Sequence, residues 1–425
     1  MRGPDSCREG LKTSIFFQGY NQDAVWSQVS TGNLRAGPEK SSPMIETVSD
    51  ASTPVTPLAA LLASAAKASK NPAYQRGAHP FAAYPLTVYR GVLTPRELDA
   101  PEQETAALAV GAAVHDLGWL RRIAVRGEDR FRWLSGMVTN MVNDLGPNEG
   151  AWNLVLNAQG RIQGDLMVWR EGDEIELEIA ADQYEKLVAH LDHFIIMDDV
   201  ELAPLTGETA AGLAAIGVTG PNADAVLGRA GLPVLAKPLT NTRVEWNGMD
   251  LRITRGYGVL GAHYALWVQA AGLGKLWKYL RTAGAVAVGS RSLDAFRIAE
   301  GIPVYGVDMV ERDLPQETGQ MRALNFNKGC YLGQEIVERI RSRGNVHRHL
   351  RQLEIDGPVP SSGTELTLDG AVAGEIRSAA ALPLPEGNRV FALGMMRGEA
   401  EVKSQNFQYG AGAEKGTARI LKERS

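Results

Sequence analysis

The chain has 425 residues, of which 44% are hydrophobic and 22% are charged, as in an ordinary globular protein of two or three domains. Its net charge of −5 argues against a dedicated nucleic-acid-binding protein. The two cysteines, Cys7 and Cys330, are too far apart to suggest a disulfide framework, and no apolar run reaches the ~18 residues of a membrane span. We therefore expect a cytoplasmic protein.

Residues 1–75 are rich in Pro, Ser and Thr and lack the periodicity of a folded core. This composition predicts a disordered or low-complexity extension. Within it, the Leu/Ala run 58–70 has the spacing of a short amphipathic helix. Because the composition changes at Met44, we also expect natural translation to start there, with residues 1–43 an upstream artefact of gene calling.

From residue 76 onward, helical and strand patterns are mixed along the chain. Two strands are predicted at 152–157 and 164–169, joined by the turn 158–161. Asp165 lies in the second of them, either as a solvated carboxylate or as a binding or catalytic group. Further predicted elements are helices at 102–110, 128–134, 183–190 and 292–301, a strand at 174–179, and short strands at 350–355, 365–368, 371–377 and 390–396.

The stretch Gly256–Gly261 reads Gly-x-Gly-x-x-Gly, the letters of a dinucleotide-binding loop. That motif must open a helix and be followed about 20 residues later by an acidic residue. Here a strand pattern, 263–268, comes next and no acidic residue lies near that offset. The sequence therefore argues against a dinucleotide site.

The most informative stretch surrounds Cys330, which Gly329 and Gly333 flank, and a helical pattern starts at Gln334. A thiol just before a helix, with Lys328 nearby, would be favoured as thiolate. The alternative is a buried, inert cysteine.

A basic run follows the thiol and is either a solvated face or a site for an anionic ligand, such as a chain of carboxylates or RNA phosphates. It comprises Arg339, Arg341, Arg343, His347, Arg348, His349 and Arg351. No cysteine accompanies its histidines at zinc-site spacing, so no metal site is predicted.

The residues Lys328-Gly-Cys-Tyr-Leu-Gly-Gln-Glu335 resemble the Lys-Gly-Cys-Tyr-x-Gly-Gln-Glu signature of the YgfZ-type folate-binding proteins. These are relatives of the glycine-cleavage T-protein, an aminomethyltransferase, and act in iron–sulfur cluster assembly and repair. The resemblance covers residues 76–425. It implies an α+β protein with two related folate-binding halves, 76–205 and 206–345, followed by a C-terminal β-barrel, 346–425.

The resemblance also implies roles for individual residues. Cys330 and Asp165 would be the catalytic candidates, and Arg297 matches an arginine that meets the folate. The alternative for Arg297 is a surface ion pair with Glu300 or Asp294. The T-protein has paired aspartates in its hairpin where this chain has Gly164-Asp165, and a pterin-anchoring glutamate where this chain has residues 260–262. The remaining cofactor-binding candidates are Trp119, Asn140, Tyr257, Lys328, Tyr331, Gln334 and Glu335. The aromatic residues Trp119, Trp152, Tyr257 and Trp267 are available either to stack on a pterin or to pack in the core.

We therefore predict a tetrahydrofolate-binding protein that acts in iron–sulfur cluster assembly or repair, with a functional cysteine, Cys330, near the folate pocket. The assembly machinery or client enzymes would be its partners. Neither nucleic acid nor membrane is an expected partner. A first alternative is a folate-dependent aminomethyltransferase, which the single hairpin carboxylate disfavours. A second is a binding module associated with tRNA modification.

Overall fold

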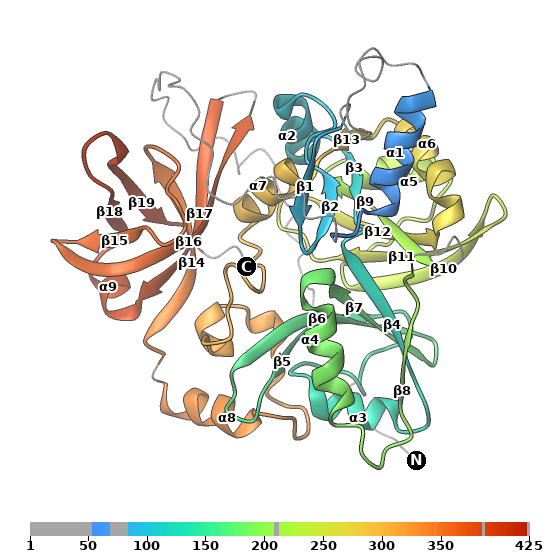
Figure 1. Cartoon of the computed structure of the whole chain (residues 1–425). Helices are drawn as coiled ribbons and strands as arrows, with labels where there is room; N and C mark the ends of the chain where they lie inside the picture. The colour runs from blue at the N-terminus through green and yellow to red at the C-terminus, as the bar shows by residue number, and fades with distance from the viewer. Residues whose placement is uncertain (1–52, 69–83, 208–211, 345, 385–386, 423–425) are drawn as a thin grey trace, which may run out of the picture. The chain divides into compact units, whose positions relative to one another are not determined.

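The computed structural model describes residues 53–68, 84–207, 212–344, 346–384 and 387–422. The chain divides into two units, residues 1–41 and 42–425. The first unit lies wholly outside the described residues, and so do our predictions about the start at Met44 and about Cys7. Figure 1 shows the elements of the second unit.

One sheet of the second unit has five antiparallel strands in the order β5-β6-β7-β4-β8. Its strands are β5 (Gly150–Leu156), β6 (Ile162–Glu171), β7 (Glu174–Ala180), β4 (Leu120–Arg126) and β8 (Glu201–Pro204). Helices α3 (Arg130–Met137) and α4 (Ala181–Asp192) accompany it. Leu187 and Leu191 on α4 are fully buried, because residues four apart share one face of a helix. The predicted hairpin is confirmed as β5 and β6.

A second sheet has six strands in the order β10-β11-β12-β9-β3-β13. These are β10 (Thr240–Trp246), β11 (Met249–Gly256), β12 (Ala262–Gln269), β9 (Leu213–Gly220), β3 (Ala113–Asp116) and β13 (Val286–Val288). Its neighbouring helices are α2 (Pro101–Val110), α5 (Ala223–Arg229), α6 (Leu273–Thr282) and α7 (Ser290–Glu300). Strand β3 precedes the whole five-stranded sheet in the chain, yet it pairs with β9 and β13. The two sheets therefore interleave along the sequence.

Helix α1 (Pro57–Ala68) confirms the predicted Leu/Ala helix. Its Leu58 and Leu62 belong to the core of the six-stranded sheet. Thr56, just before this helix, donates a hydrogen bond from its hydroxyl to the buried Asp116 in β3. Residues 53–68 are thus part of the folded body, although they lie inside the extension that we predicted for residues 1–75.

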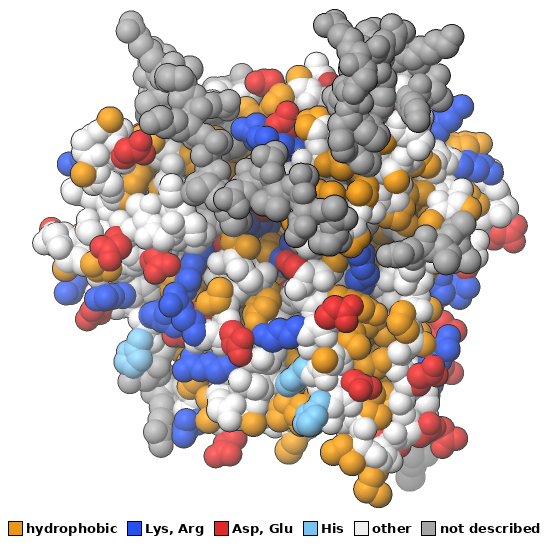
Figure 2. Space-filling model, in the orientation of Figure 1, with side chains coloured by type: hydrophobic (Ala, Val, Ile, Leu, Met, Phe, Trp, Pro, Cys, Tyr) orange, Lys and Arg blue, Asp and Glu red, His pale blue; other side chains and the backbone are white. Residues whose placement is uncertain are grey.

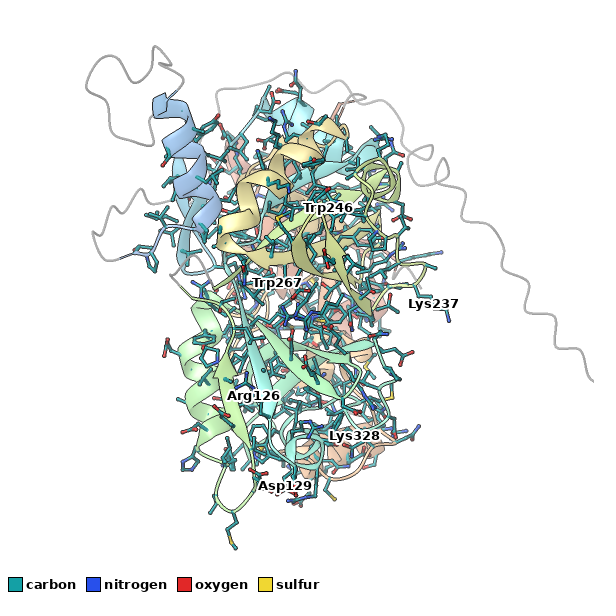
Figure 3. The ribbon with its side chains drawn as sticks, turned by 90° about the vertical axis from the view of Figure 1, so that its right-hand side faces the viewer. Arg126, Asp129, Lys237, Trp246, Trp267 and Lys328 are labelled. Atoms are coloured by element: carbon teal, nitrogen blue, oxygen red, sulfur yellow. The ribbon has the colours of Figure 1, made fainter. Side chains whose placement is uncertain are left out.

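The two sheets are joined by buried polar contacts. Trp267 in β12 is 0% exposed, and its indole Nε1 donates to Glu178 in β7 at 3.2 Å. The guanidinium of Arg122, in β4, lies over the same ring at 5.2 Å. Figure 3 shows Trp267 where the two sheets meet. This tryptophan therefore packs in the core and is not available to stack on a ligand.

The C-terminal part forms a closed six-stranded barrel in the order β14-β17-β16-β15-β18-β19. The strands are β14 (Arg348–Asp356), β17 (Gly387–Arg397), β16 (Ala371–Leu384), β15 (Glu365–Leu368), β18 (Asn406–Tyr409) and β19 (Gly416–Ile420), with α9 (Gly398–Lys403) after β17. Closure removes the unpaired edges of an open sheet. The predicted α+β class with a C-terminal barrel is confirmed. A separate two-stranded ribbon, β1 (Leu86–Tyr89) and β2 (Val92–Pro95), precedes α2.

Among the described residues, no helix combines the length and the apolar character needed to cross a bilayer.

We expect Leu58→Ala to lower the free energy of unfolding by about 2–5 kcal/mol, because it removes a fully buried side chain and leaves a cavity. Urea denaturation followed by circular dichroism measures this loss. Ser64→Ala on the exposed side of the same helix is the matched control. Equal effects of the two changes would show that α1 does not belong to the core.

Candidate functional site

The segment from residue 302 to 334 leads from α7 to the cysteine motif and crosses the hairpin of β5 and β6. The Tyr305 hydroxyl donates to the Ile162 carbonyl at 3.4 Å, and the backbone N–H of Asn325 donates to the Thr139 carbonyl at 3.0 Å. Residues that are far apart in the sequence are thus held at the end of the five-stranded sheet.

Lys328 fixes the loop that carries the thiol. Its Nζ donates to the carbonyls of Ser135 at 2.7 Å, Val138 at 2.5 Å and Asn140 at 2.9 Å. The last carbonyls of a helix have no intrahelical partner, so this ammonium caps the end of α3. Burial lowers the pKa of Lys328 to about 8. These contacts show that Lys328 holds the loop, and its expected effect on the thiolate stays a prediction.

Gly333 brings the motif into close contact with the hairpin turn. Its φ is +81°, and a Cβ at this position would lie 2.5 Å from the carbonyl oxygen of Asn157 and 3.1 Å from the Cα of Gly160. Only glycine suits both the dihedral and the space. Helix α8 (Gln334–Arg343) begins directly after Gly333, as the sequence predicted.

Cys330 is a free, exposed thiol, so the alternative of a buried, inert cysteine is wrong. The neighbouring Tyr331 is buried, with its hydroxyl unpaired among the described residues, and burial raises its pKa to about 12. Gln334 accepts from the Tyr331 backbone N–H at 3.3 Å, whereas Glu335 is exposed in the first turn of α8. Tyr331 and Gln334 thus shape the loop, and Cys330 and Glu335 face solvent.

Asp165 is held by two donors inside the first sheet. The Trp152 indole Nε1 donates to its Oδ2 at 2.9 Å, and the Gln183 Nε2 donates to its Oδ1 at 2.9 Å. It is therefore not a loosely solvated hairpin carboxylate. Asp165 lies three residues along β6 from Ile162, or ~10 Å from the hairpin end at ~3.3 Å per residue. The structure gives it no contact with Cys330.

Three side chains from separate parts of the chain meet in what we call the Arg322 cluster, which consists of Trp152, Tyr257 and Arg322. Arg322 lies in a 3₁₀ turn, η4 (Met321–Ala323). Its guanidinium carbon lies 3.9 Å from the ring centroid of Tyr257 and 5.2 Å from that of Trp152. Of the aromatic candidates, Trp152 and Tyr257 are therefore brought together, while Trp267 is in the core.

Arg297 has carboxylate partners within the protein. Its Nε donates to Asp294 at 2.7 Å, and its NH1 donates to Asp308 at 2.5 Å. The other oxygen of Asp308, which is fully buried, accepts from Ser378 in the barrel. Of the two roles weighed for Arg297, folate contact and ion pair, the structure shows ion pairs, and they are buried. One joins Arg297 to Asp294 in the same helix, and the other, with Asp308, links α7 to the barrel through Ser378.

Asn140 and Trp119 likewise have internal contacts. The Asn140 amide donates to the carbonyls of Trp152 at 2.9 Å and Arg322 at 2.8 Å. It therefore links the backbones of two residues of the Arg322 cluster. Trp119 stacks edge to face on Tyr89, with ring centroids 5.6 Å apart, and packs against the core cluster that contains Trp267.

The glycine-rich loop Gly256–Gly261 encloses a carboxylate of the chain itself. The Oε1 of Glu300 accepts from the backbone N–H groups of Val259 at 2.9 Å and Leu260 at 2.8 Å, and its Oε2 lies 2.7 Å from His263 Nε2. Burial alone would lower the pKa of His263, but the Glu300 carboxylate raises it overall. The loop thus binds an internal anion. Its N–H groups at Val259 and Leu260 already donate to Glu300, so they are not free to bind the phosphates of a dinucleotide.

Sequence reasoning missed four polar residues of this region: Gln183, Glu300, Arg322 and His263. None of these residues belongs to a sequence motif or a periodic pattern that would indicate a functional role. Glu300 lies at the end of α7 and reaches back about 40 residues to the loop. Arg322 lies in a turn with no periodic pattern. Such long-range contacts are set by topology and not by local sequence.

The basic run after the thiol is largely paired. Arg348 lies 3.0 Å from Glu317 and 3.4 Å from Asp313, and Arg351 lies 3.1 Å from Glu401. Figure 2 shows acidic and basic side chains interspersed on the face that it presents. Arg348 therefore stabilises the junction with the barrel and Arg351 the barrel itself, and neither is free to bind a phosphate.

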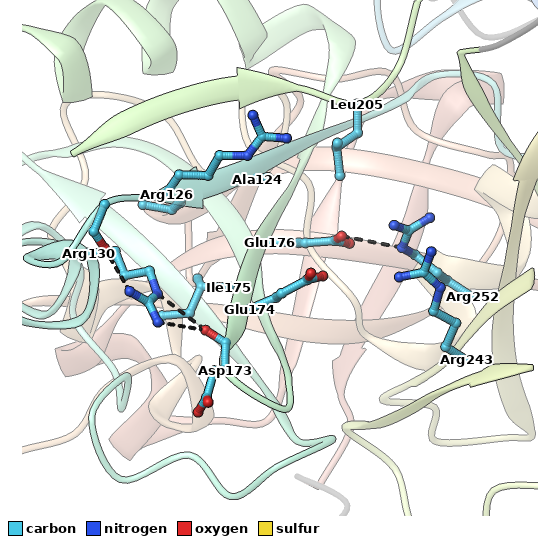
Figure 4. A pocket seen from close by; sticks show the side chains of 12 residues that line it. Ala124, Arg126, Arg130, Asp173, Glu174, Ile175, Glu176, Leu205, Arg243 and Arg252 are labelled. Carbon is cyan, nitrogen blue, oxygen red and sulfur yellow. Dashed lines mark hydrogen bonds and ion pairs between the residues drawn. The ribbon is translucent and has the colours of Figure 1, made fainter.

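An open pocket of about 490 Å³ lies elsewhere, between β4 and β7 of one sheet and β10 and β11 of the other. Figure 4 shows Arg252 paired with Glu176 inside it, and Arg130 bonded to the Asp173 carbonyl. Arg126 extends along its edge. None of the predicted site residues lines this pocket.

Among the residues that the structure describes, no group of three or more His, Cys, Asp or Glu side chains is arranged to hold a metal ion.

Comparisons with known proteins agree with this architecture. The model of the GCVT N-terminal domain family matches residues 73–328. A provisionally named chloroplastic transferase of Arabidopsis thaliana is 23% identical over 283 residues, which cover 66% of this chain and 64% of that protein. The aminomethyltransferase of Rubrobacter xylanophilus is 26% identical over 309 residues, which cover 70% and 80%.

The crystal structure of the glycine cleavage system aminomethyltransferase T from Bartonella henselae superposes with a TM-score of 0.71. The sequences are 18% identical, and the match covers 80% of this chain and 93% of the other. At that identity the likeness establishes the fold.

Glu300→Gln should lower the free energy of unfolding by about 1–3 kcal/mol, because it removes the ion pair with His263 and keeps an oxygen for the loop N–H groups. A histidine whose pKa is raised on folding contributes stability below its unfolded pKa of ~6.5, and that contribution is lost as the pH rises through the folded value. The loss in Glu300→Gln should therefore be larger at pH 6 than at pH 9. Urea denaturation at both values measures it, with exposed Glu335→Gln as control; a pH-independent loss would contradict the pairing.

Because Cys330 is exposed, it should react with iodoacetamide in the native protein within about tenfold of its rate in urea. In a Cys7→Ala background, mass spectrometry should find one alkylated thiol per chain, and none after Cys330→Ala. Protection of Cys330 until the protein unfolds would show that the thiol is enclosed.

Proposed function

The chain belongs to the GCVT N-terminal domain family, and on that premise we propose that it binds tetrahydrofolate and acts in the assembly or repair of iron–sulfur proteins through Cys330. The observation that carries this proposal is an exposed thiol on a loop held in one place. Lys328 binds that loop to the end of α3, and Gly333 packs it on the hairpin turn. A fixed, exposed thiol suits chemistry on a second protein that approaches from solvent.

The chemistry of the Arg322 cluster supports a flat, polar ring as ligand. The faces of Trp152 and Tyr257 offer stacking surfaces. Asp165, oriented by Trp152 and Gln183, retains free lone pairs that could accept from ring N–H groups. A cofactor site usually consists of apolar and aromatic side chains with a small number of polar groups among them. These residues fit a reduced pterin and would hold and orient it, while the folate supplies one-carbon or redox chemistry when bound.

Aminomethyl transfer is the second candidate, and the names of the relatives favour it. The reaction needs an acid–base group placed against the reacting nitrogen. Asp165 is a single carboxylate whose two oxygens already accept from Trp152 and Gln183, and Gly164 precedes it where the T-protein has a second aspartate. This arrangement suits binding better than proton transfer.

In this proposal the partners are client iron–sulfur enzymes or the machinery that supplies them, and the location is the cytoplasm. A role with tRNA has weaker support, because the basic residues Arg348 and Arg351 are bound to carboxylates and would have to give up these pairs to meet phosphates.

We expect Cys330→Ala to bind tetrahydrofolate with unchanged affinity and to lose the ability to restore an iron–sulfur enzyme in cells that lack the protein. Among the described residues, no hydrogen bond or ring contact joins the exposed Cys330 to Trp152, Tyr257 or Arg322, so binding and rescue should separate. Isothermal titration under reducing conditions and an activity assay of the client enzyme measure the two properties. Cys7→Ala is the matched control.

Full rescue by Cys330→Ala would remove the thiol from the function. Turnover of the wild-type protein in a glycine-cleavage assay with lipoylated carrier protein would favour the aminomethyltransferase instead.

A further inference from the structure

We infer that Arg322 is a displaceable plug: its guanidinium covers the aromatic faces of Trp152 and Tyr257 and must leave before a flat heteroaromatic ligand can stack there. This inference rests on the proposed function and adds to it the residue that controls access to the site.

The first step is the position of the guanidinium. It lies over the Tyr257 ring at 3.9 Å and over the Trp152 ring at 5.2 Å. A planar guanidinium stacked on an aromatic face occupies the place that another planar ring would take. Trp152 comes from β5 and Tyr257 from the loop after β11, so Arg322 lies where the two sheets and the linking segment meet.

The second step is how weakly the guanidinium is held. Its Nε is buried and has no hydrogen-bond partner among the described residues, and in that part of the chain no carboxylate forms an ion pair with it. Arg297 differs, since Asp294 and Asp308 both bind it.

A buried donor without an acceptor is unfavourable, and burial lowers the pKa of Arg322. Movement of Arg322 toward water would give Nε a hydrogen bond and break no ion pair. It would give up the side-chain hydrogen bond with Tyr257 and the attraction of the Glu300 carboxylate.

The third step is what stays in place. The carbonyl of Arg322 accepts from Asn140 at 2.8 Å, and the carbonyl of Ala323 accepts from Thr139 at 2.7 Å. The backbone of this turn is therefore anchored, and rotation of one side chain is enough to uncover the rings. The preceding residue, Met321, is 52% exposed, so the turn borders solvent.

A consequence is selectivity for the ring system. A ligand must replace the contacts of the guanidinium with stacking of its own. Tetrahydrofolate carries a pterin whose planar, polar pyrimidinone half can do so, whereas the only ring of p-aminobenzoylglutamate, its tail, is a benzene ring without polar ring atoms. The plug therefore lowers the affinity for every ligand that stacks there and favours those with a planar, polar heterocycle.

The test is isothermal titration of the full chain with tetrahydrofolate under reducing conditions. Arg322→Ala should bind about tenfold more tightly than the wild type, because binding no longer displaces the guanidinium. Arg322→Met, which keeps an apolar stem, should also bind more tightly, and it serves if the alanine variant does not fold. Arg341→Ala is the matched control. The Arg341 guanidinium, on α8, also lies over an aromatic ring, that of Phe326, at 4.4 Å. The affinity of this variant for tetrahydrofolate should equal that of the wild type.

Unchanged or weaker binding by both Arg322 variants, with normal binding by the wild type, would overturn the plug and leave the proposed function standing; weaker binding would make Arg322 a ligand contact. Absence of binding by the wild type and by every variant would overturn both. Binding by the Arg322 variants and not by the wild type would support both the proposed function and the plug, and would show that the plug blocks binding completely.

Discussion

The partly buried ammonium of Lys328 satisfies three carbonyls in the last turn of α3 and just after it, and the placement of the exposed thiol depends on this contact. Neither group could be left alone. A buried charge without partners is costly, and so are unpaired carbonyls at a helix end. Each partner therefore requires the other, and the loop between residues 325 and 333 is tied to a helix almost 190 residues away in sequence. A rigid loop then presents Cys330 to solvent.

Other buried charged side chains also form hydrogen bonds that hold connecting segments in place. Glu300 gathers the N–H groups of Val259 and Leu260, and Asp308 joins Arg297 of α7 to Ser378 of the barrel. In each case a charged side chain inside the protein is stabilised by donors from a distant element, as a buried charge must be. Trp152 and Asp165 lie on strands, whereas Cys330 and Tyr257 lie on loops and Arg322 lies on a turn, and buried polar contacts hold these loops in place.

The sequence predicted what depends on local pattern. The hairpin of β5 and β6, the helix after Gly333 and the barrel strands follow from periodicities of two or 3.6 residues and from turn residues. It did not predict that β3 leaves its neighbours to pair with β9 and β13, since pairing between distant strands carries no local signal. Arg322 was missed for the same reason: a turn residue in a polar stretch reveals its aromatic neighbours only when the chain is folded.

The Gly256–Gly261 loop shows how a familiar spacing can serve another purpose. Its N–H groups are oriented toward an anion, as in loops that bind phosphate, but the anion is the Glu300 carboxylate and the donors are therefore taken. Tyr257 lies two residues before the first of these donors, so the internal carboxylate holds the backbone next to that residue. The bond from Trp152 to Asp165 holds the other ring directly. Arg322, in contrast, is held by no ion pair in the described part of the chain. Ligand binding at such a site would move the arginine and leave both rings where they are.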